Sequence, residues 1–162
     1  MKTISLILAT TFEGGIGYNN KLPWNYKSEL KKFKEITTNT ENNLKQNAVI
    51  MGSKTYYSLP NNNLPNRINI VLSRINNSNN ENYDKHNIKV YNKILDAIEY
   101  CNNNDFIENI FIIGGTEIFN YFLNNINLID NIYLTLIKNI YECDKYININ
   151  LIYKNFKFIK ND

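Results

Sequence analysis

The stretch NIFIIGGTEIFNYFL, from Asn109 to Leu123, decides the fold that the sequence predicts. Its first half is a continuous apolar run, typical of a strand that is buried on both faces of a sheet. Two glycines end this run, and an amphipathic segment typical of a helix begins directly after them, at Thr116 or Glu117. The side chains expected to point inward from this helix are Ile118, Phe119, Phe122 and Leu123.

The same alternation of strand and helix extends along the chain in both directions. Apolar runs predict further strands at Ile4–Ala9, Ala48–Gly52, Ile68–Ser73, Ile88–Tyr91 and Asn131–Ile137. Helices are predicted from about Tyr26, at Thr55–Leu59 and at Leu95–Cys101. Continuous apolar strands separated by helices favour an α/β fold with a central, mostly parallel β-sheet flanked by helices on both faces. Since no linker or internal repeat divides the chain, residues 1–162 are expected to form a single domain.

Composition narrows the class of protein. The chain has 162 residues, of which 43% are hydrophobic and 20% charged, as in globular domains. The net charge of +3 is scattered, which argues against a nucleic-acid partner and suits an anionic small molecule. Cys101, Cys143 and His86 lack the spacing of metal ligands, so no metal is expected. The apolar run Ile4–Ala9 is too short for a signal peptide or a membrane span, so a cytoplasmic location with reduced cysteines is expected.

The segment LPWNYKSELKKF, Leu22 to Phe33, places an acid among lysines. In a helix that turns about 100° per residue, Tyr26, Leu30 and Phe33 share one face and the lysines lie on the opposite one. Glu29 falls at the edge of the apolar face. A carboxylate directed toward a core is costly unless a partner pairs with it, so the pattern indicates a ligand pocket.

Three predicted strands end in residues suited to an anionic ligand. Gly114 and Gly115 precede a helix whose N-terminus favours a phosphate, Ser53-Lys54-Thr55 follow a second strand, and Arg74 follows a third. The carboxyl ends of strands are where open α/β sheets bind ligands. Each signal is weak by itself, because a Gly-Gly pair is more often a simple turn and Thr55 is typical of a helix cap. Neither GxGxxG nor GxxxxGK[ST] occurs.

The order of the motifs is more specific than any one of them. It runs Ala9, GIG (Gly15–Gly17), LPW (Leu22–Trp24), Glu29, Phe33, VIMG with Thr55, Leu-Pro-x-Arg ending at Arg67, LSR (Leu72–Arg74), IIGG and YLT (Tyr133–Thr135). With this order and spacing, the sequence from about Ile4 to Asp144 resembles the dihydrofolate reductase family. The resemblance implies NADPH-dependent reduction of 7,8-dihydrofolate to 5,6,7,8-tetrahydrofolate, with hydride transfer to pterin C6 and protonation at N5. Such a step supports one-carbon metabolism and thymidylate synthesis.

The resemblance also implies a role for residues on the substrate side. Glu29 is expected to pair with the pterin amino group and ring N–H, supported by Thr135, so that the ligand itself is the partner of the inward carboxylate. Trp24 is expected to order a water beside the pterin, and Leu22 to pack near the nicotinamide when its loop closes; these four are the expected catalytic residues. Arg67 is expected to pair with the α-carboxylate of the substrate. The expected apolar contacts are Ile7, Leu30, Phe33, Leu59, Leu64 and Ile113.

The cofactor implied by the resemblance is NADPH. Gly114 and Gly115 would form a tight turn beside the nicotinamide, often with a cis peptide bond, and Lys54, Ser73 and Arg74 would meet the 2′-phosphate. The residues expected to contact the cofactor are Ala9, Ile16, Gly17, Gly52, Lys54, Thr55, Leu72, Ser73, Arg74, Gly114, Gly115, Thr116, Glu117, Ile118 and Phe119. Antifolates such as methotrexate are expected inhibitors, and the protein is expected to be a monomer unless it is fused to thymidylate synthase.

The C-terminus departs from the family pattern. After Asp144 the family continues with a long antiparallel hairpin, whereas only Lys145–Asp162 remain here, with one strand-like run, NFKFI, at Asn155–Ile159. The hairpin is therefore expected to be incomplete. Two other functions stay open: a reductase of the same fold that acts on a pyrimidine intermediate of riboflavin synthesis, and a non-catalytic or weakened descendant that binds folate or a nucleotide.

Overall fold

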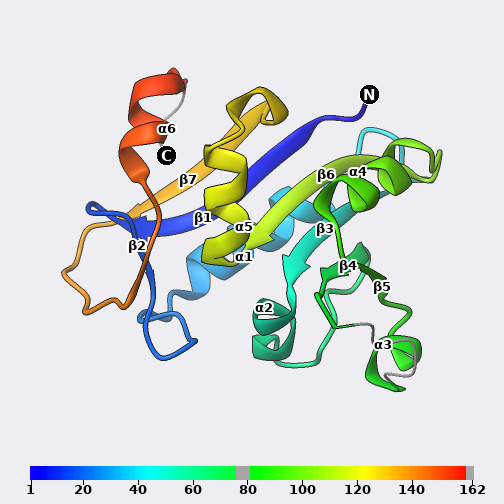
Figure 1. Ribbon diagram of the computed structural model, residues 1–162, viewed down its shortest axis with the longest axis horizontal. Coiled ribbons are helices and arrows are strands. Elements are labelled where there is room, and N and C mark those ends of the chain that lie inside the picture. Colours follow the sequence, from blue (N-terminus) through cyan, green and yellow to red (C-terminus); the bar gives the residue numbers. More distant parts are fainter. Residues whose placement is uncertain (76–80, 160–162) are drawn as a thin grey trace.

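The computed structural model describes residues 1–75 and 81–159. Its centre is a six-stranded sheet in the order β5-β4-β3-β6-β1-β7 (Figure 1). All neighbouring strands in this sheet are parallel, as the continuous apolar runs predict. The strands are β1 (Ile4–Thr11), β3 (Gln46–Gly52), β4 (Ile68–Leu72), β5 (Lys89–Tyr91), β6 (Ile107–Gly114) and β7 (Asn131–Ile137). The predicted α/β class and the six strands predicted between Ile4 and Ile137 are confirmed.

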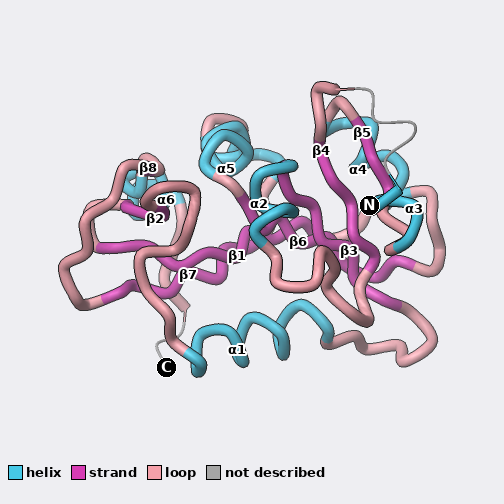
Figure 2. Tube along the Cα trace, turned by 90° about the horizontal axis from the view of Figure 1, so that it is seen from below, coloured by secondary structure: helices cyan, strands magenta, loops and turns pink. Residues whose placement is uncertain are grey.

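Helices cover both faces of the sheet, as Figure 2 shows, with α1 on one side and α4 and α5 on the other. The helices are α1 (Lys27–Thr38), α2 (Ser53–Ser58), α3 (Glu81–Lys85), α4 (Ile94–Asn102), α5 (Thr116–Leu123) and α6 (Ile149–Asn155), with a 3-10 turn at Ile126–Leu128. A small antiparallel sheet joins β2 (Gly15–Gly17) to β8 (Lys145–Tyr146). The elements β2, β8, α3 and α6 are not predicted from the sequence.

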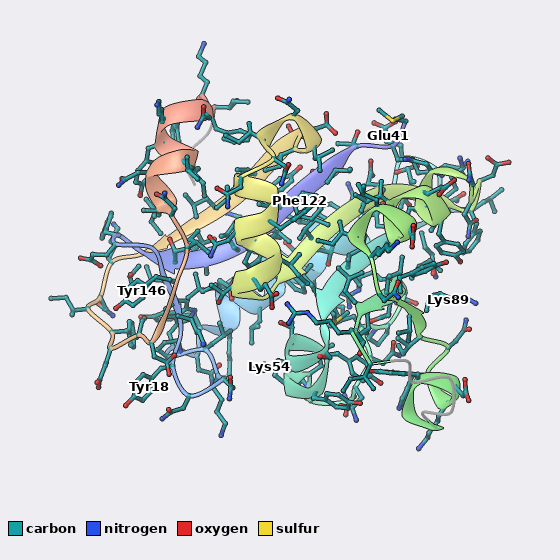
Figure 3. All side chains as sticks on the ribbon, viewed as in Figure 1. Tyr18, Glu41, Lys54, Lys89, Phe122 and Tyr146 are labelled. Atoms are coloured by element: carbon teal, nitrogen blue, oxygen red, sulfur yellow. The ribbon has the colours of Figure 1, made fainter. Side chains whose placement is uncertain are left out.

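Alternation along the strands divides the core into two apolar clusters, because successive side chains of a strand point to opposite faces. On β1, Leu6 and Leu8 belong to the cluster beneath α5, whereas Ile7 belongs to the cluster beneath α1. The helix α5 buries the four side chains that its periodicity predicts to be inward, among them Phe122, labelled in Figure 3. We call the layer with Phe122 the α5-face cluster and the layer with Ile7 the α1-face cluster.

One fully buried polar side chain fixes α1 against the sheet. The Nδ2 atom of Asn47, on β3, donates to the backbone oxygens of Thr37 at 3.0 Å and Asn39 at 2.7 Å, at the end of α1. The Oδ1 atom of Asn47 accepts from the backbone nitrogen of Asn109 on β6 at 3.1 Å. A buried amide with its donors and acceptor satisfied stabilises one arrangement of the elements it joins. The position of α1 over β3 and β6 therefore depends on this residue.

The strand predicted at Asn155–Ile159 is wrong. Asn155 is the last residue of α6, and residues 156–159 belong to no strand. Ile149 and Ile152 are spaced for one face of a helix, and both are buried in the α5-face cluster, where Phe156 also packs. The helix forms because it buries these side chains, whereas the alternation of Phe156 and Phe158 finds no strand to pair with among the described residues. In that part of the chain β7 pairs with β1 alone.

We predict that Asn47→Ala lowers the free energy of unfolding by about 2–4 kcal/mol, because it removes several buried hydrogen bonds and leaves their backbone partners unsatisfied. Urea unfolding followed by circular dichroism measures this loss. Asn43→Ala, at an exposed position of the loop after α1, is the matched control and should change the free energy by less than about 0.5 kcal/mol. Equal stability of the two variants would contradict the role given to Asn47.

Candidate active site

The predicted site residues gather where the parallel strands end. The carboxyl ends of β1, β3, β4 and β6 lie at one edge of the sheet, and the N-termini of α2 and α5 follow directly from β3 and β6. Figure 3 shows Lys54 and Tyr18 at this side of the molecule and Glu41 at the other. A shallow depression lined by Asp96, Glu99 and Tyr100 lies at the opposite edge, next to Lys2, and holds none of the predicted residues.

Glu29 lies half-buried in the first turn of α1, at the edge of the apolar stripe, as its spacing predicts. Phe33, one turn further along, packs against the α1-face cluster. The side chain of Glu29 forms no hydrogen bond or ion pair with any residue that the structure describes. Burial raises the pKa of the Glu29 carboxyl, because a charged carboxylate loses hydration there and gains no partner. The site thus contains an acid whose charge is uncompensated.

The apolar residues predicted to contact the substrate come together around one cluster. Ile7 is a buried member of the α1-face cluster, and the other members of this group pack against it: Phe33, Leu59, Leu64 and Ile113. They come from β1, α1, the turn after α2, the segment before β4, and β6. Leu30 differs, because its side chain is 50% exposed and is not part of the cluster.

Arg67 is buried, with only 7% of its surface exposed, rather than lying free on the surface after its turn. Its Nη1 atom donates to Thr37 Oγ1 at 3.0 Å, and its Nε atom donates to the backbone oxygen of Pro65 at 3.0 Å. No carboxylate of the described residues pairs with it. Burial lowers the pKa of the Arg67 guanidinium, because the charged form loses hydration there. An arginine side chain nevertheless stays charged in proteins. A desolvated cation with unused N–H groups is well suited to an anionic ligand.

The other three predicted catalytic residues, Trp24, Thr135 and Leu22, have different surroundings. Trp24 is 5% exposed, and its Nε1 atom is buried without a hydrogen-bond partner. Thr135 pairs in register with Ala9, so both residues lie on the face of the sheet that α1 covers. No hydrogen bond joins Thr135 to Glu29. Leu22 is 54% exposed, so its side chain extends from the loop into solvent.

The segment that follows β7 contacts the loop between β1 and α1, which contains Trp24. β2 pairs with β8, the backbone nitrogen of Asp144 donates to Gly17 O at 2.8 Å, and Asp144 Oδ2 accepts from Asn19 N at 3.0 Å. On the other side of this loop, Tyr141 packs edge-on against Trp24, with ring centroids 5.6 Å apart. The loop is therefore attached to the chain beyond β7.

Tyr141 also reaches the start of α1. Its hydroxyl lies 2.7 Å from that of Tyr26, which accepts a further hydrogen bond from Asn139 Nδ2 at 2.9 Å. The hydrogen bond with Tyr141 raises the pKa of Tyr26. Sequence analysis did not single out Tyr141, Asn139, Thr37 or Asp144 as part of the site. No local signal distinguishes them, because each acts on a residue far away in the chain.

A glycine-lined surface lies on the cofactor side of the predicted site. The peptide bond between Gly114 and Gly115 is cis, and Gly114 has a φ of +133°, which L side chains rarely adopt. A Cβ added to Gly115 would lie 3.3 Å from Thr55 Oγ1, and one added to Gly52 would lie 3.3 Å from Ile118 Cδ1. Side chains at these positions would fill the space next to the start of α5. The residues present therefore fit a group that approaches the backbone closely.

Some of the other residues predicted to contact the cofactor pack into the core, and the rest lie at the starts of helices or in loops and strands. Those that pack into or against the α5-face cluster are Ile16, Leu72, Ile118 and Phe119. Gly17 lies in β2, Thr116 opens α5, and Lys54 is exposed at the start of α2. Ser73 is buried, and its hydroxyl bonds to the backbone of Ile75. Thr55 was predicted as a helix cap, which is wrong: Gly52 is the N-cap residue of α2, and Thr55 lies inside the helix.

Arg74 and Glu117 form an ion pair at the outer edge of this surface. Arg74 follows β4, and Glu117 lies in the first turn of α5. Among the described residues, no group of His, Cys, Asp and Glu could hold a metal ion. No helix there is long and apolar enough to cross a membrane. The arrangement can hold a ligand with hydrogen-bond donors at Glu29, an anionic end at Arg67 and a second, phosphate-bearing ligand near the helix N-termini.

Comparison with known proteins finds a matching family model and relatives whose names include dihydrofolate reductase. The family model described as dihydrofolate reductase matches residues 3–162. A dihydrofolate reductase of Aedes albopictus is 36% identical over 167 residues, which cover 100% of this chain and 87% of that protein. A bifunctional dihydrofolate reductase-thymidylate synthase of Paramecium tetraurelia is 39% identical over 150 residues, which cover 93% of this chain and 29% of that protein. A dihydrofolate reductase of Candida albicans is 40% identical over 136 residues, covering 77% of this chain and 62% of that protein.

We predict that Glu29→Gln makes the ligand-free protein more stable at neutral pH. The pKa of Glu29 is higher in the folded chain than its ordinary value of 4.5, so the unfolded chain holds this proton less tightly. The carboxylate therefore costs stability above the folded-state pKa, and this cost disappears as the pH falls below the unfolded-state value. Urea midpoints measured across this pH range should differ most at neutral pH and converge in acid.

The matched control for this prediction is Glu99→Gln, at an exposed position of α4. It should leave the urea midpoint unchanged at neutral pH. A Glu29→Gln protein that is less stable than the parent at neutral pH would show that Glu29 gains a compensating partner in the folded chain.

Proposed function

The chain belongs to the dihydrofolate reductase family, as the order of its motifs predicts, and we propose that it reduces 7,8-dihydrofolate to 5,6,7,8-tetrahydrofolate with NADPH. The observation that carries this proposal is a pair of opposite, desolvated charges, Glu29 and Arg67, neither of which has an oppositely charged partner among the described residues. They flank the α1-face cluster, which supplies apolar surface between them. A ligand with N–H donors at one end, flat rings in the middle and a carboxylate at the other end satisfies both charges.

The spacing of these two charges along α1 supports a ligand of this length. Glu29, Phe33 and Thr37 follow one another at intervals of four residues, so they form one stripe of the helix. Thr37 accepts a hydrogen bond from Arg67, and the eight residue steps from Glu29 to Thr37 correspond to a rise of about 12 Å. A bicyclic heterocycle joined through a benzoyl group to an amino acid can span such a distance.

The chemical step divides between the cofactor and the protein. When bound, NADPH supplies the hydride. Glu29 holds the amino and N–H groups of the pterin and polarises the ring, and a water delivers the proton to N5. The unpartnered Nε1 atom of Trp24 is available to donate a hydrogen bond to such a water. The loop held by Asp144 and Tyr141 excludes bulk water, and the protein acts mainly by orienting the two rings.

The cofactor would be held by the glycine-lined surface. The backbone at Gly52 and Gly115 is partly exposed and carries no side chain, which suits a group that approaches closely, and the N-terminus of α5 favours a phosphate. Lys54 and Arg74 would bind the 2′-phosphate and favour NADPH over NADH. We also propose that antifolates such as methotrexate compete at Glu29, that the chain acts as a monomer unless it is joined to thymidylate synthase, and that it works in the cytoplasm, where the free Cys101 and Cys143 stay reduced.

The direct test is oxidation of NADPH by the purified protein in the presence of dihydrofolate, followed by the loss of reduced-nicotinamide absorbance. We expect turnover, and we expect Glu29→Gln to lower kcat/KM by about 100-fold or more, because it removes the group that polarises the pterin. Glu99→Gln should retain full activity. Turnover that survives Glu29→Gln unchanged would contradict the assigned role. Methotrexate binding without any turnover would favour a non-catalytic folate-binding protein.

A second prediction concerns Arg67. Replacing it by lysine keeps the charge and loses the planar fork, so KM for dihydrofolate should rise by about 10-fold or more while kcat changes little. A dihydropterin that lacks the benzoylglutamate arm should be used equally well by both proteins. Steady-state kinetics with the two substrates separates a carboxylate contact from general damage, which would raise KM for both. An equal effect on both substrates would contradict the proposed contact.

A further inference from the structure

The ion pair between Arg74 and Glu117 crosses the part of the sheet where the proposed cofactor would lie. Arg74 follows β4 and Glu117 follows β6, and in the sheet these two strands flank β3. Neighbouring strands lie about 4.8 Å apart, so the pair spans about 10 Å across the carboxyl end of β3. The helix α2 starts from this end, with Gly52 as its N-cap residue. The pair therefore bridges the surface formed by the two helix N-termini.

A carboxylate at this position is unsuited to contact a phosphate directly, because two anions repel each other. Glu117 is nevertheless favourable in the ligand-free chain for two reasons. It lies in the first turn of α5, where a negative charge interacts well with the helix dipole, and it neutralises Arg74. Glu117 thus provides for Arg74 and for α5 the negative charge that a bound phosphate would otherwise provide.

The two cations at this edge differ in their availability. Arg74 is engaged by Glu117, whereas Lys54 is exposed and forms no ion pair with any described residue. A phosphate can meet Lys54 directly, whereas at Arg74 it competes with the carboxylate of Glu117. Both side chains of the pair are well exposed, at 83% and 78%, so this exchange requires no change in the core.

We propose that Glu117 is a specificity-determining residue that competes with the 2′-phosphate of the cofactor for Arg74. This inference rests on the proposed function and deepens it, because it assigns Glu117 to the discrimination between phosphorylated and unphosphorylated nicotinamide cofactors. Glu117 weakens that discrimination by occupying Arg74 in the free protein. Exposed ion pairs of this kind are weak, so the competition should change affinity by about two- to five-fold.

The test compares two small probes that differ in the 2′-phosphate, adenosine 2′,5′-bisphosphate and adenosine 5′-monophosphate, by calorimetric titration of the full chain. We expect Glu117→Gln to bind the bisphosphate about two- to five-fold more tightly than the parent and to bind the monophosphate equally well. Arg74→Gln should weaken bisphosphate binding, and adding Glu117→Gln to it should give no gain, because the competitor acts through Arg74. Glu99→Gln, which changes the net charge equally, should have no effect.

The outcomes separate the inference from the proposed function. A gain that appears equally with the monophosphate, or that persists in the Arg74→Gln background, would show that Glu117 acts by general repulsion and would overturn the inference. Weaker bisphosphate binding by Glu117→Gln would also overturn it. If the parent oxidises NADPH with dihydrofolate while Glu117→Gln leaves bisphosphate affinity unchanged, this inference alone fails. If the parent binds neither probe and shows no turnover, the proposed function fails with it.

Discussion

The hydrogen bonds of the buried Asn47 amide hold α1 in the one position on which the site depends. Asn47 joins the end of α1 to β3 and β6, and next to it Thr37 receives a hydrogen bond from Arg67. A helix attached only by apolar contacts could rotate or slide, because the hydrophobic effect has no direction. The amide fixes the register of the helix, and this register sets where Glu29 and Arg67 lie relative to the apolar cluster. A structural residue thus sets the positions of the two charged side chains on which the proposed function rests.

The same geometry keeps two charges in an unfavourable state. Glu29 and Arg67 lose hydration, and neither has an oppositely charged partner among the described residues, so each costs free energy in the absence of a ligand. A ligand that satisfies both charges recovers this energy on binding, and the free protein is less stable than its fold would allow. The Arg74–Glu117 pair shows the opposite arrangement, because there the protein satisfies its own cation and a ligand must compete for it.

The two clusters of the core also separate the two halves of the site. The proposed substrate contacts come from the α1-face cluster, and several of the proposed cofactor contacts pack on the α5-face cluster. The halves meet at the carboxyl ends of the strands, where Gly115 is partly exposed and where Asp144 and Tyr141, from the chain beyond β7, contact the loop that contains Asn19 and Trp24.

Local sequence determined the elements and the residue types at their ends. Hydrophobic periodicity predicted the six strands, the buried face of α5 and the position of Glu29 at the edge of an apolar stripe, because each of these depends on residues within a few turns of one another. The strand order, the hydrogen bonds of Asn47, the burial of Arg67 and the Arg74–Glu117 pair depend on contacts between distant parts of the chain. Only the tertiary structure decided them. For the same reason α6 forms next to the strand predicted from the alternation of Phe156 and Phe158, because Ile149 and Ile152 pack into the core. Local alternation carries no information about which partner strands are present.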